Sequence, residues 1–145
     1  MTPDALTQFL HREIPLTAAM RLSVIRSEAG EIEIAAPLAP NVNLHGTAFA
    51  GSLATLGLVS GWLLLHRALE QAALPAQLVA QKNQCQFLAP AREELRGLAR
   101  LPDADWLRFA DALRHKGRAR VEVLTEIRAG ATLAVTHTGT YVAKR

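Results

Sequence analysis

The chain has 145 residues, of which 50% are hydrophobic and 20% are charged, with a net charge of +3. This length suits one domain over residues 1–145, and the hydrophobic content excludes a disordered or fibrous chain. The only cysteine, Cys85, excludes an intrachain disulfide framework and favours a reducing, cytoplasmic setting. The charge excess is mild and forms no run of Lys and Arg, so we expect no nucleic-acid partner.

Two kinds of periodicity open the chain. Thr2 followed by Pro3 is a typical helix start, and apolar residues at helical spacing predict a short helix that reaches Arg12. Apolar and polar residues then alternate over 20–24 and again over 31–35, on either side of a glycine turn. This pattern predicts a hairpin of two half-buried strands.

The stretch 46–65 carries no charged residue and matches the ~20 apolar residues of a membrane span. Its four glycines, its hydroxyl side chains and the strand patterns on both sides favour instead a helix buried in a soluble domain, so we expect no membrane span. A helix that is apolar all round must be wrapped by other elements.

Further strands follow this helix and supply the wrapping. Four segments alternate at the strand period: 78–88, 95–101, 119–127 and 133–141. We expect the first two to form a hairpin about a turn at 89–93. Asp103 is the expected cap of a short helix before the last two strands, and Gly117 is expected to end it. The prediction is an α+β fold, with an antiparallel sheet around one long central helix.

Several stretches resemble the hot-dog fold thioesterase superfamily. They are the loop and helix start at 41–52 (NVNLHGTAFAGS), CQFLAP at 85–90, GRARVEV at 117–123 and GTYVA at 139–143. More narrowly, the chain is similar to the thioesterase-like domain found C-terminal to acetyltransferase domains in some bacterial proteins. The resemblance implies the hot-dog fold and an acyl thioester of coenzyme A or acyl carrier protein as substrate. It implies no separate cofactor, because coenzyme A or phosphopantetheine is part of the substrate.

Thioester hydrolysis needs donors aimed at the carbonyl oxygen and a group that positions or deprotonates water. Gly51 and Ser52 fall in the first turn of the long helix, where backbone N–H groups are unpaired and the helix dipole favours negative charge. The alternative is that such glycines only let the helix pack against the sheet, which we favour for Gly57 and Gly61. His45 precedes these donors, and the resemblance implies a histidine-glycine pair in this loop.

His45 can orient the substrate, donate to its carbonyl or act as base, or it can simply cap the loop. Asn43 is the preferred residue to orient water, although Asx turns would explain it equally well. The hydroxyls of Ser52 and Thr55 share a helix face and can hold a water, or each can bond to the preceding turn. The candidate catalytic residues are Asn43, His45 and Ser52, and the candidate substrate-binding residues are Asn41, Gly46, Thr47, Phe49, Gly51, Thr55, Gln81 and Asn83.

The chain departs from many relatives in having no acidic residue between Glu33 and Glu70, so an acid on the central helix cannot be carried over. Gln81 and Asn83 alternate together along their strand and would reach a site at a subunit boundary, or would only bond across the interface. The other histidines are expected at the surface or at helix ends, and no metal site is expected; they are His11, His66, His115 and His137.

The leading hypothesis is therefore an acyl thioester hydrolase. The alternatives are a non-catalytic acyl thioester binding protein of the same fold, or a hydratase or dehydratase. We expect a homodimer in which the strands 78–88 of two copies pair antiparallel, or a dimer of such dimers. The phosphates of coenzyme A, or an acidic carrier protein, would meet cations that otherwise form a solvated basic surface: Lys82, Arg92, Lys116, Arg118 and Arg120.

Overall fold

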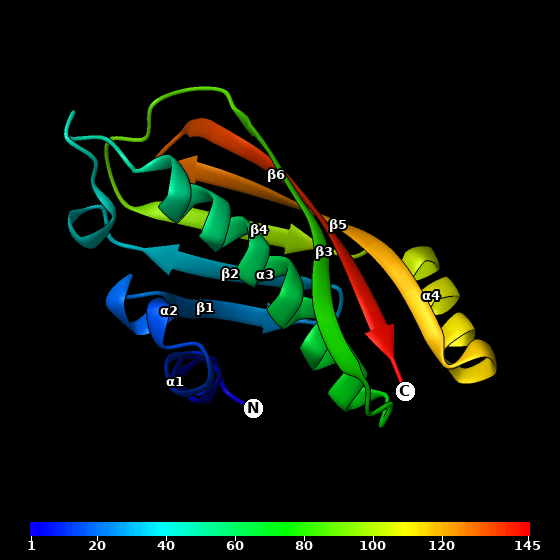
Figure 1. Cartoon of the computed structure of the whole chain (residues 1–145). Helices are drawn as coiled ribbons and strands as arrows, with labels where there is room; N and C mark the ends of the chain where they lie inside the picture. The colour runs from blue at the N-terminus through cyan, green and yellow to red at the C-terminus, as the bar shows by residue number, and fades with distance from the viewer.

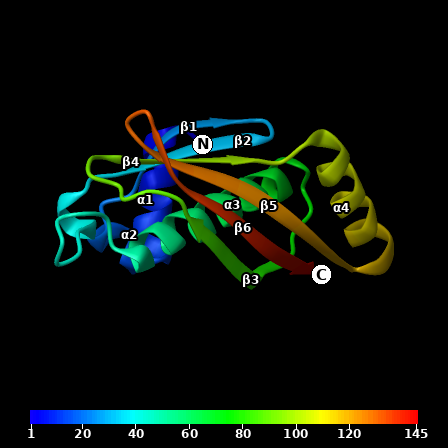
Figure 2. The same ribbon diagram turned by 90° about the horizontal axis from the view of Figure 1, so that it is seen from above.

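The computed structural model describes residues 1–145 as a six-stranded antiparallel sheet that curls around one long helix, α3 (Figures 1 and 2). The strands lie in the order β1-β2-β4-β5-β6-β3. Their bounds are β1 Ser23–Glu28, β2 Glu31–Ala36, β3 Gln77–Phe87, β4 Leu95–Arg100, β5 Arg118–Ala129 and β6 Thr132–Lys144. The helices are α1 Pro3–Glu13, α2 Pro15–Ala19, η1 Ala39–Asn41, α3 Ala50–Gln71 and α4 Asp103–Lys116. The predicted α+β class and the sheet around a central helix are confirmed.

Helix α3 begins and ends later than the uncharged stretch that predicted it. It begins at Ala50 because Gly46 adopts a φ of +77° and Phe49 is still extended. It continues beyond the uncharged stretch because Arg67 and Glu70 pair across one turn at 2.8 Å while their apolar neighbours remain buried. Ten of its 22 residues are buried, so α3 is the core helix of a soluble fold, as predicted.

Two glycines let α3 approach β6 closely. A Cβ at Gly57 would lie 2.4 Å from the ring of His137, and a Cβ at Gly61 would lie 2.4 Å from the hydroxyl of Tyr141. That hydroxyl donates to the Leu58 carbonyl at 2.7 Å, and burial raises the pKa of Tyr141, so the donor stays protonated. The packing role predicted for Gly57 and Gly61 is confirmed.

The predicted hairpin between the third and fourth strands is wrong. β3 pairs with β6 at the edge of the sheet, whereas β4 lies between β2 and β5. The loop between them does not turn back, because Leu88 N–H donates to the Ala134 carbonyl and Ala48 N–H donates to the Ala91 carbonyl. These bonds attach the loop to β6 and to the segment before α3, so the chain passes the N-terminal end of α3 on its way from β3 to β4.

The shorter helices are mostly set by local signals. Thr2 caps α1 by accepting from Ala5 N–H at 3.1 Å, and Gly117 ends α4 with a φ of +71°, both as predicted. Asp103 is the first residue of α4 rather than its cap, because Pro102 occupies the cap position. The short helix α2 was not predicted.

Candidate functional site

The loop between β2 and α3, drawn in cyan in Figure 1, is held by its own backbone. Val42 and Ala48 form a β-bridge, and Asn43 N–H donates to the Thr47 carbonyl at 2.8 Å. These bonds leave the loop tip exposed: Leu44 is 90% exposed, and a side chain at Gly46 would meet no atom within 4 Å.

The two asparagines of this segment both bond to the backbone. The Asn43 side-chain oxygen accepts from the N–H groups of His45 at 2.8 Å and Thr47 at 3.2 Å, and its amide donates to the Thr47 hydroxyl at 2.9 Å. The buried Asn41 amide donates to the Met20 carbonyl at 2.9 Å. Both therefore hold the loop in shape, and a role of Asn43 in orienting water stays a prediction.

His45 lies at the exposed tip of this loop, and its imidazole makes no hydrogen bond within the chain. The ring is therefore free to contact a ligand or another subunit.

The first turn of α3 presents unpaired donors. Phe49 is the N-cap and offers no side-chain bond, and the N–H groups of Ala50, Gly51 and Ser52 have no acceptor in the chain. Such donors, together with the positive end of the helix dipole, form a ready anion site. The Phe49 ring is 54% exposed and packs on Gly51, where an added Cβ would lie 2.4 Å from it.

The two hydroxyls on this turn differ. Thr55 donates to the Gly51 carbonyl at 2.9 Å, which is the bond to the preceding turn. Ser52 is half-buried, and its hydroxyl makes no hydrogen bond within the chain. Ser52 is therefore the freer of the two to contact water or substrate.

Asn83 and His137 form a polar pair that sequence spacing did not indicate. His137 is fully buried in β6, contrary to the expected surface position, and its Nε2 lies 2.5 Å from the Asn83 side-chain oxygen. Burial lowers the pKa of His137 to about 4, so the ring is neutral at pH 7. Because the Asn83 side-chain oxygen can only accept, the single N–H of the neutral ring lies on Nε2 and donates a hydrogen bond to it. Its Nδ1 and the hydroxyl of Thr125, its partner on β5, are buried without hydrogen bonds. The one sequence signal for this burial was the alternation of His137 with Val135 and Tyr141.

Gln81 does not join Asn83. A bulge between Ala80 and Lys82 leaves Gln81 outside the ladder, and its side chain lines surface grooves together with Lys82 and Arg120. The bulge interrupts the alternation that the sequence pattern assumed. Gln81 therefore lines the surface grooves, whereas Asn83 contacts His137.

Three surface hollows of the chain lie away from the loop tip and the first turn of α3. None of them is lined by a residue from 41–55, and of the candidate residues only Gln81 lines them. No three potential metal ligands come together either. The loop tip is thus open to solvent, and most residues of β3 are exposed.

The whole chain matches solved structures in fold. A protein of unknown function from Chlorobaculum tepidum aligns with a TM-score of 0.90 and 23% identity over 99% of this chain and 97% of that chain. A protein described as a putative thioesterase from Shewanella oneidensis aligns with a TM-score of 0.85 and 26% identity over 99% and 97%. The thioesterase HI1161 from Haemophilus influenzae aligns with a TM-score of 0.68 and 16% identity over 99% and 90%.

These likenesses confirm the hot-dog fold. No curated protein matches the chain significantly. The sequence itself is more specific, because residues 3–145 match the family described as "Putative thioesterase (yiiD_Cterm)". With its helix, loop and sheet arranged as in the hot-dog thioesterases, the chain belongs to this family over almost its whole length.

Proposed function

We propose that the protein hydrolyses thioesters of acyl groups with coenzyme A or acyl carrier protein at the first turn of α3. The observation that carries the proposal is the set of unpaired N–H groups at Ala50, Gly51 and Ser52, in a family described as thioesterases. Water adds to the thioester carbonyl, and the oxygen gains the negative charge that these donors stabilise. The intermediate then collapses, breaks the C–S bond and yields a carboxylic acid and a thiol.

His45 is the proposed base. It takes a proton from the attacking water and returns it to the leaving thiolate, so the imidazole is regenerated at the end of each cycle. Its exposed position on the loop tip before α3 supports this role, because the ring is not committed to another partner. Asn43 fixes the loop that carries it.

The site is completed by a second copy of the chain. β3 is an edge strand with a partner on one side only, and nine of its 11 residues are exposed. Such an edge is normally paired or covered. Antiparallel pairing of two β3 strands would enclose the open surface beside α3 and bring groups of the partner to it. A tetramer would consist of two such dimers.

A non-catalytic binding protein is the main alternative, favoured by the lack of any acidic residue between Glu33 and Glu70. A hydratase or dehydratase is the third candidate. The test is a colorimetric free-thiol assay with coenzyme A thioesters of increasing acyl length. Thiol release supports hydrolysis, and saturable binding without thiol release supports the binding protein. Loss of an enoyl or hydroxyacyl signal without thiol release supports the hydratase.

A further inference from the structure

Two adjoining grooves lie on the sheet face that points away from α3. Their volumes are about 670 Å³ and about 520 Å³, and they share Gln81 and Arg120. On β5, Arg118 and Arg120 alternate with residues that face the core, so their side chains project outward. The first groove is walled by α4 and β3 and the second by the start of β5. We call the two together the basic groove.

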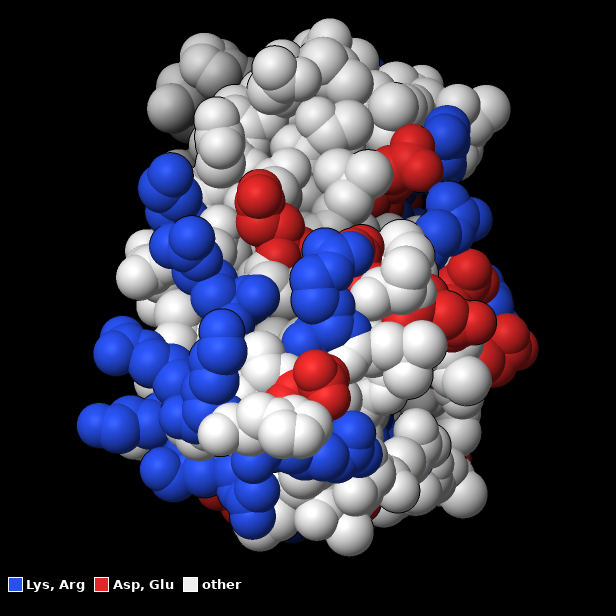
Figure 3. Space-filling view, turned by 90° about the vertical axis from the view of Figure 1, so that its right-hand side faces the viewer, with Lys and Arg blue, Asp and Glu red and all other residues white.

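The basic groove has an excess of cations, most of them unpaired. Two carboxylates line it, Asp105 and Glu122, and Asp105 is already engaged by Arg108 at 3.1 Å. Figure 3 shows Lys and Arg gathered along the left and lower part of this side of the molecule. The groove cations without an ion-pair partner are Lys82, Lys116, Arg118 and Arg120. These are four of the five cations that the sequence suggested; Arg92 lies elsewhere.

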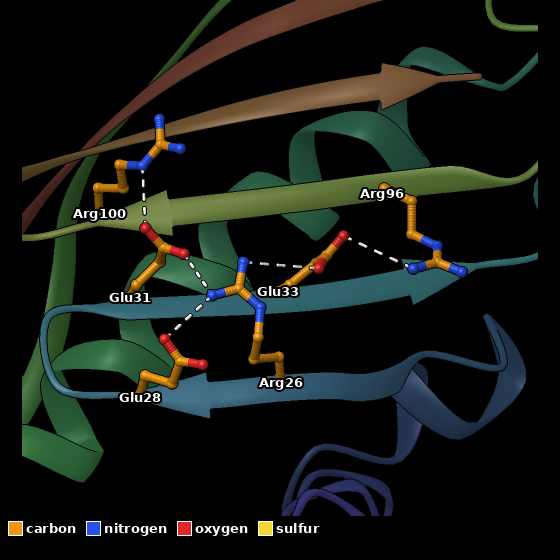
Figure 4. A network of polar contacts seen from close by, with 6 residues as sticks. All are labelled: Arg26, Glu28, Glu31, Glu33, Arg96 and Arg100. Atoms are coloured by element: carbon orange, nitrogen blue, oxygen red, sulfur yellow. Dashed lines mark hydrogen bonds and ion pairs between the residues drawn. The ribbon is translucent and has the colours of Figure 1, made fainter. Parts of the chain in front are cut away.

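The other half of the same sheet shows the opposite arrangement. Across β1, β2 and β4 each arginine is matched to a glutamate on its own or a neighbouring strand (Figure 4). The pairs include Arg26 with Glu28 at 3.2 Å, Arg100 with Glu31 at 3.1 Å and Arg96 with Glu33 at 3.6 Å. Arg26 and Arg100 thereby hold the pKa of Glu31 below its usual value.

This contrast points to a ligand. Clustered cations without counterions repel one another and raise the local concentration of anions. The fold neutralises the arginines of β1 and β4 with neighbouring carboxylates, and on β5 it pairs Arg128 with Glu126 at 3.5 Å but leaves Arg118 and Arg120 free. The free cations line the basic groove, whereas Arg26, Arg96 and Arg100 line neither of its two parts.

We propose that the basic groove binds a phosphate-bearing nucleotide, with phosphates beside Lys82 and Arg120 in one lobe and beside Lys116 and Arg118 in the other. The volume of each of the two grooves falls within the range of roughly 300–1,000 Å³ typical of small-ligand sites, and guanidinium groups bind phosphate in a two-pronged fashion. Thr140 and the glutamines add neutral polar groups to the lining. A protein partner would instead require a broader contact of ~800 Å².

Two ligands carry such a phosphate-bearing nucleotide. One is the nucleotide end of a coenzyme A thioester, which rests on the proposed function and requires the ligand to pass around β3 from the face of α3. The other is a free nucleotide that binds independently of hydrolysis. The groove chemistry is the same for both.

The first test measures binding to the full chain by calorimetry, with ADP, coenzyme A and inorganic phosphate as probes. We expect saturable binding of ADP and coenzyme A that weakens as salt rises. Arg120→Gln should weaken it by about tenfold or more, because it removes charge-assisted hydrogen bonds. Arg100→Gln is the matched control, with the same change on the same sheet face, and should leave the affinity within about twofold of wild type. No saturable binding, equal weakening by both variants, or binding of phosphate alone would overturn the proposal.

The second test separates the two sources by comparing acyl-CoA with the corresponding acyl-pantetheine, which lacks the nucleotide. If the coenzyme occupies the basic groove, Arg120→Gln raises KM for acyl-CoA more than for acyl-pantetheine. If a free nucleotide binds there, Arg120→Gln leaves both KM values unchanged while the affinity for ADP falls. A chain that binds ADP but hydrolyses neither substrate would contradict the proposed function and leave the nucleotide site standing.

Discussion

His137 makes the stability of the fold depend on pH. Burial lowers its pKa to about 4, whereas histidine in an unfolded chain titrates near ~6.5. As the pH falls below ~6.5, the unfolded chain takes up a proton that the folded chain excludes, so the free energy of unfolding decreases until about pH 4. Above ~6.5 the ring is neutral in both states and this dependence ends. Between pH 7 and pH 5 the expected loss is about 2 kcal/mol.

Urea unfolding at these two pH values checks the expectation. His137→Gln keeps a polar side chain beside Asn83 but does not titrate in this window. The variant should show a smaller loss of stability between pH 7 and pH 5 than the wild type, by about 2 kcal/mol, whatever its stability at pH 7. Equal losses in both proteins would show that His137 is protonated as easily in the folded chain as in the unfolded one.

His45 is the residue on which the proposed chemistry depends most. His45→Ala should lower kcat by roughly 10²–10⁴, the range for a lost general base, without changing the melting temperature, because the side chain is exposed. His115→Ala is the control, since it removes another exposed histidine, on α4. Unchanged turnover in His45→Ala would remove the histidine from the mechanism and direct attention to Asn43 or Thr55.

Residues whose roles are local could be predicted from the sequence, and those with distant partners could not. The cap at Thr2 and the left-handed Gly117 depend on their immediate neighbours. The bond between His137 and Asn83 joins positions 54 residues apart, and no spacing in the sequence connects them. For the same reason, the sequence does not identify which groups of the folded molecule or of a second copy contact His45.

At the scale of elements, periodicity predicts strands and helices but not their neighbours. The alternation in 78–88 and 95–101 correctly indicated β3 and β4, yet it could not show that β3 pairs with β6. That pairing is set by the loop bonds from Leu88 and Ala91 and by α3, which the sheet must cover. Trp62 on α3 also holds β3 in place, because its indole N–H donates to the Leu78 carbonyl at 3.2 Å.

The contact between α3 and β6 gives a prediction at this scale. Gly57→Ala places a Cβ 2.4 Å from the buried His137 ring, so α3 must shift away from β6. We expect a net destabilisation of about 1–3 kcal/mol from overpacking, even though alanine favours the helix. Gly51→Ala is the matched control in the same helix, because the three atoms nearest to its Cβ all belong to the exposed ring of Phe49, which can rotate away. Guanidinium unfolding should therefore show a loss for Gly57→Ala alone, and similar losses for both would contradict the close packing of α3 on β6.

At the scale of the whole molecule, the two edges of the sheet are treated differently. β1 is flanked by α1, and the Thr7 hydroxyl accepts from Val24 N–H at 2.8 Å. β3 has no such cover, and apolar side chains remain exposed on and after it: Val79, Phe87 and Leu88. An uncovered, partly apolar edge of this length promotes association with another strand. The covered edge and the open edge together favour one defined pairing over random aggregation.

The last prediction is that two copies pair through β3 and that activity requires the pair. Light scattering at micromolar concentration should give about twice the chain mass of 15.7 kDa. Val79→Glu combined with Phe87→Glu should yield monomers, because the pairing would bury like charges, whereas Leu107→Glu on the exposed face of α4 should leave the dimer intact. The monomeric variant should keep its helix and sheet content in circular dichroism and lose thiol release, because the loop tip and the first turn of α3 then face solvent alone. A wild-type monomer, or a monomeric variant with full turnover, would mean that one chain contains every group that the reaction needs.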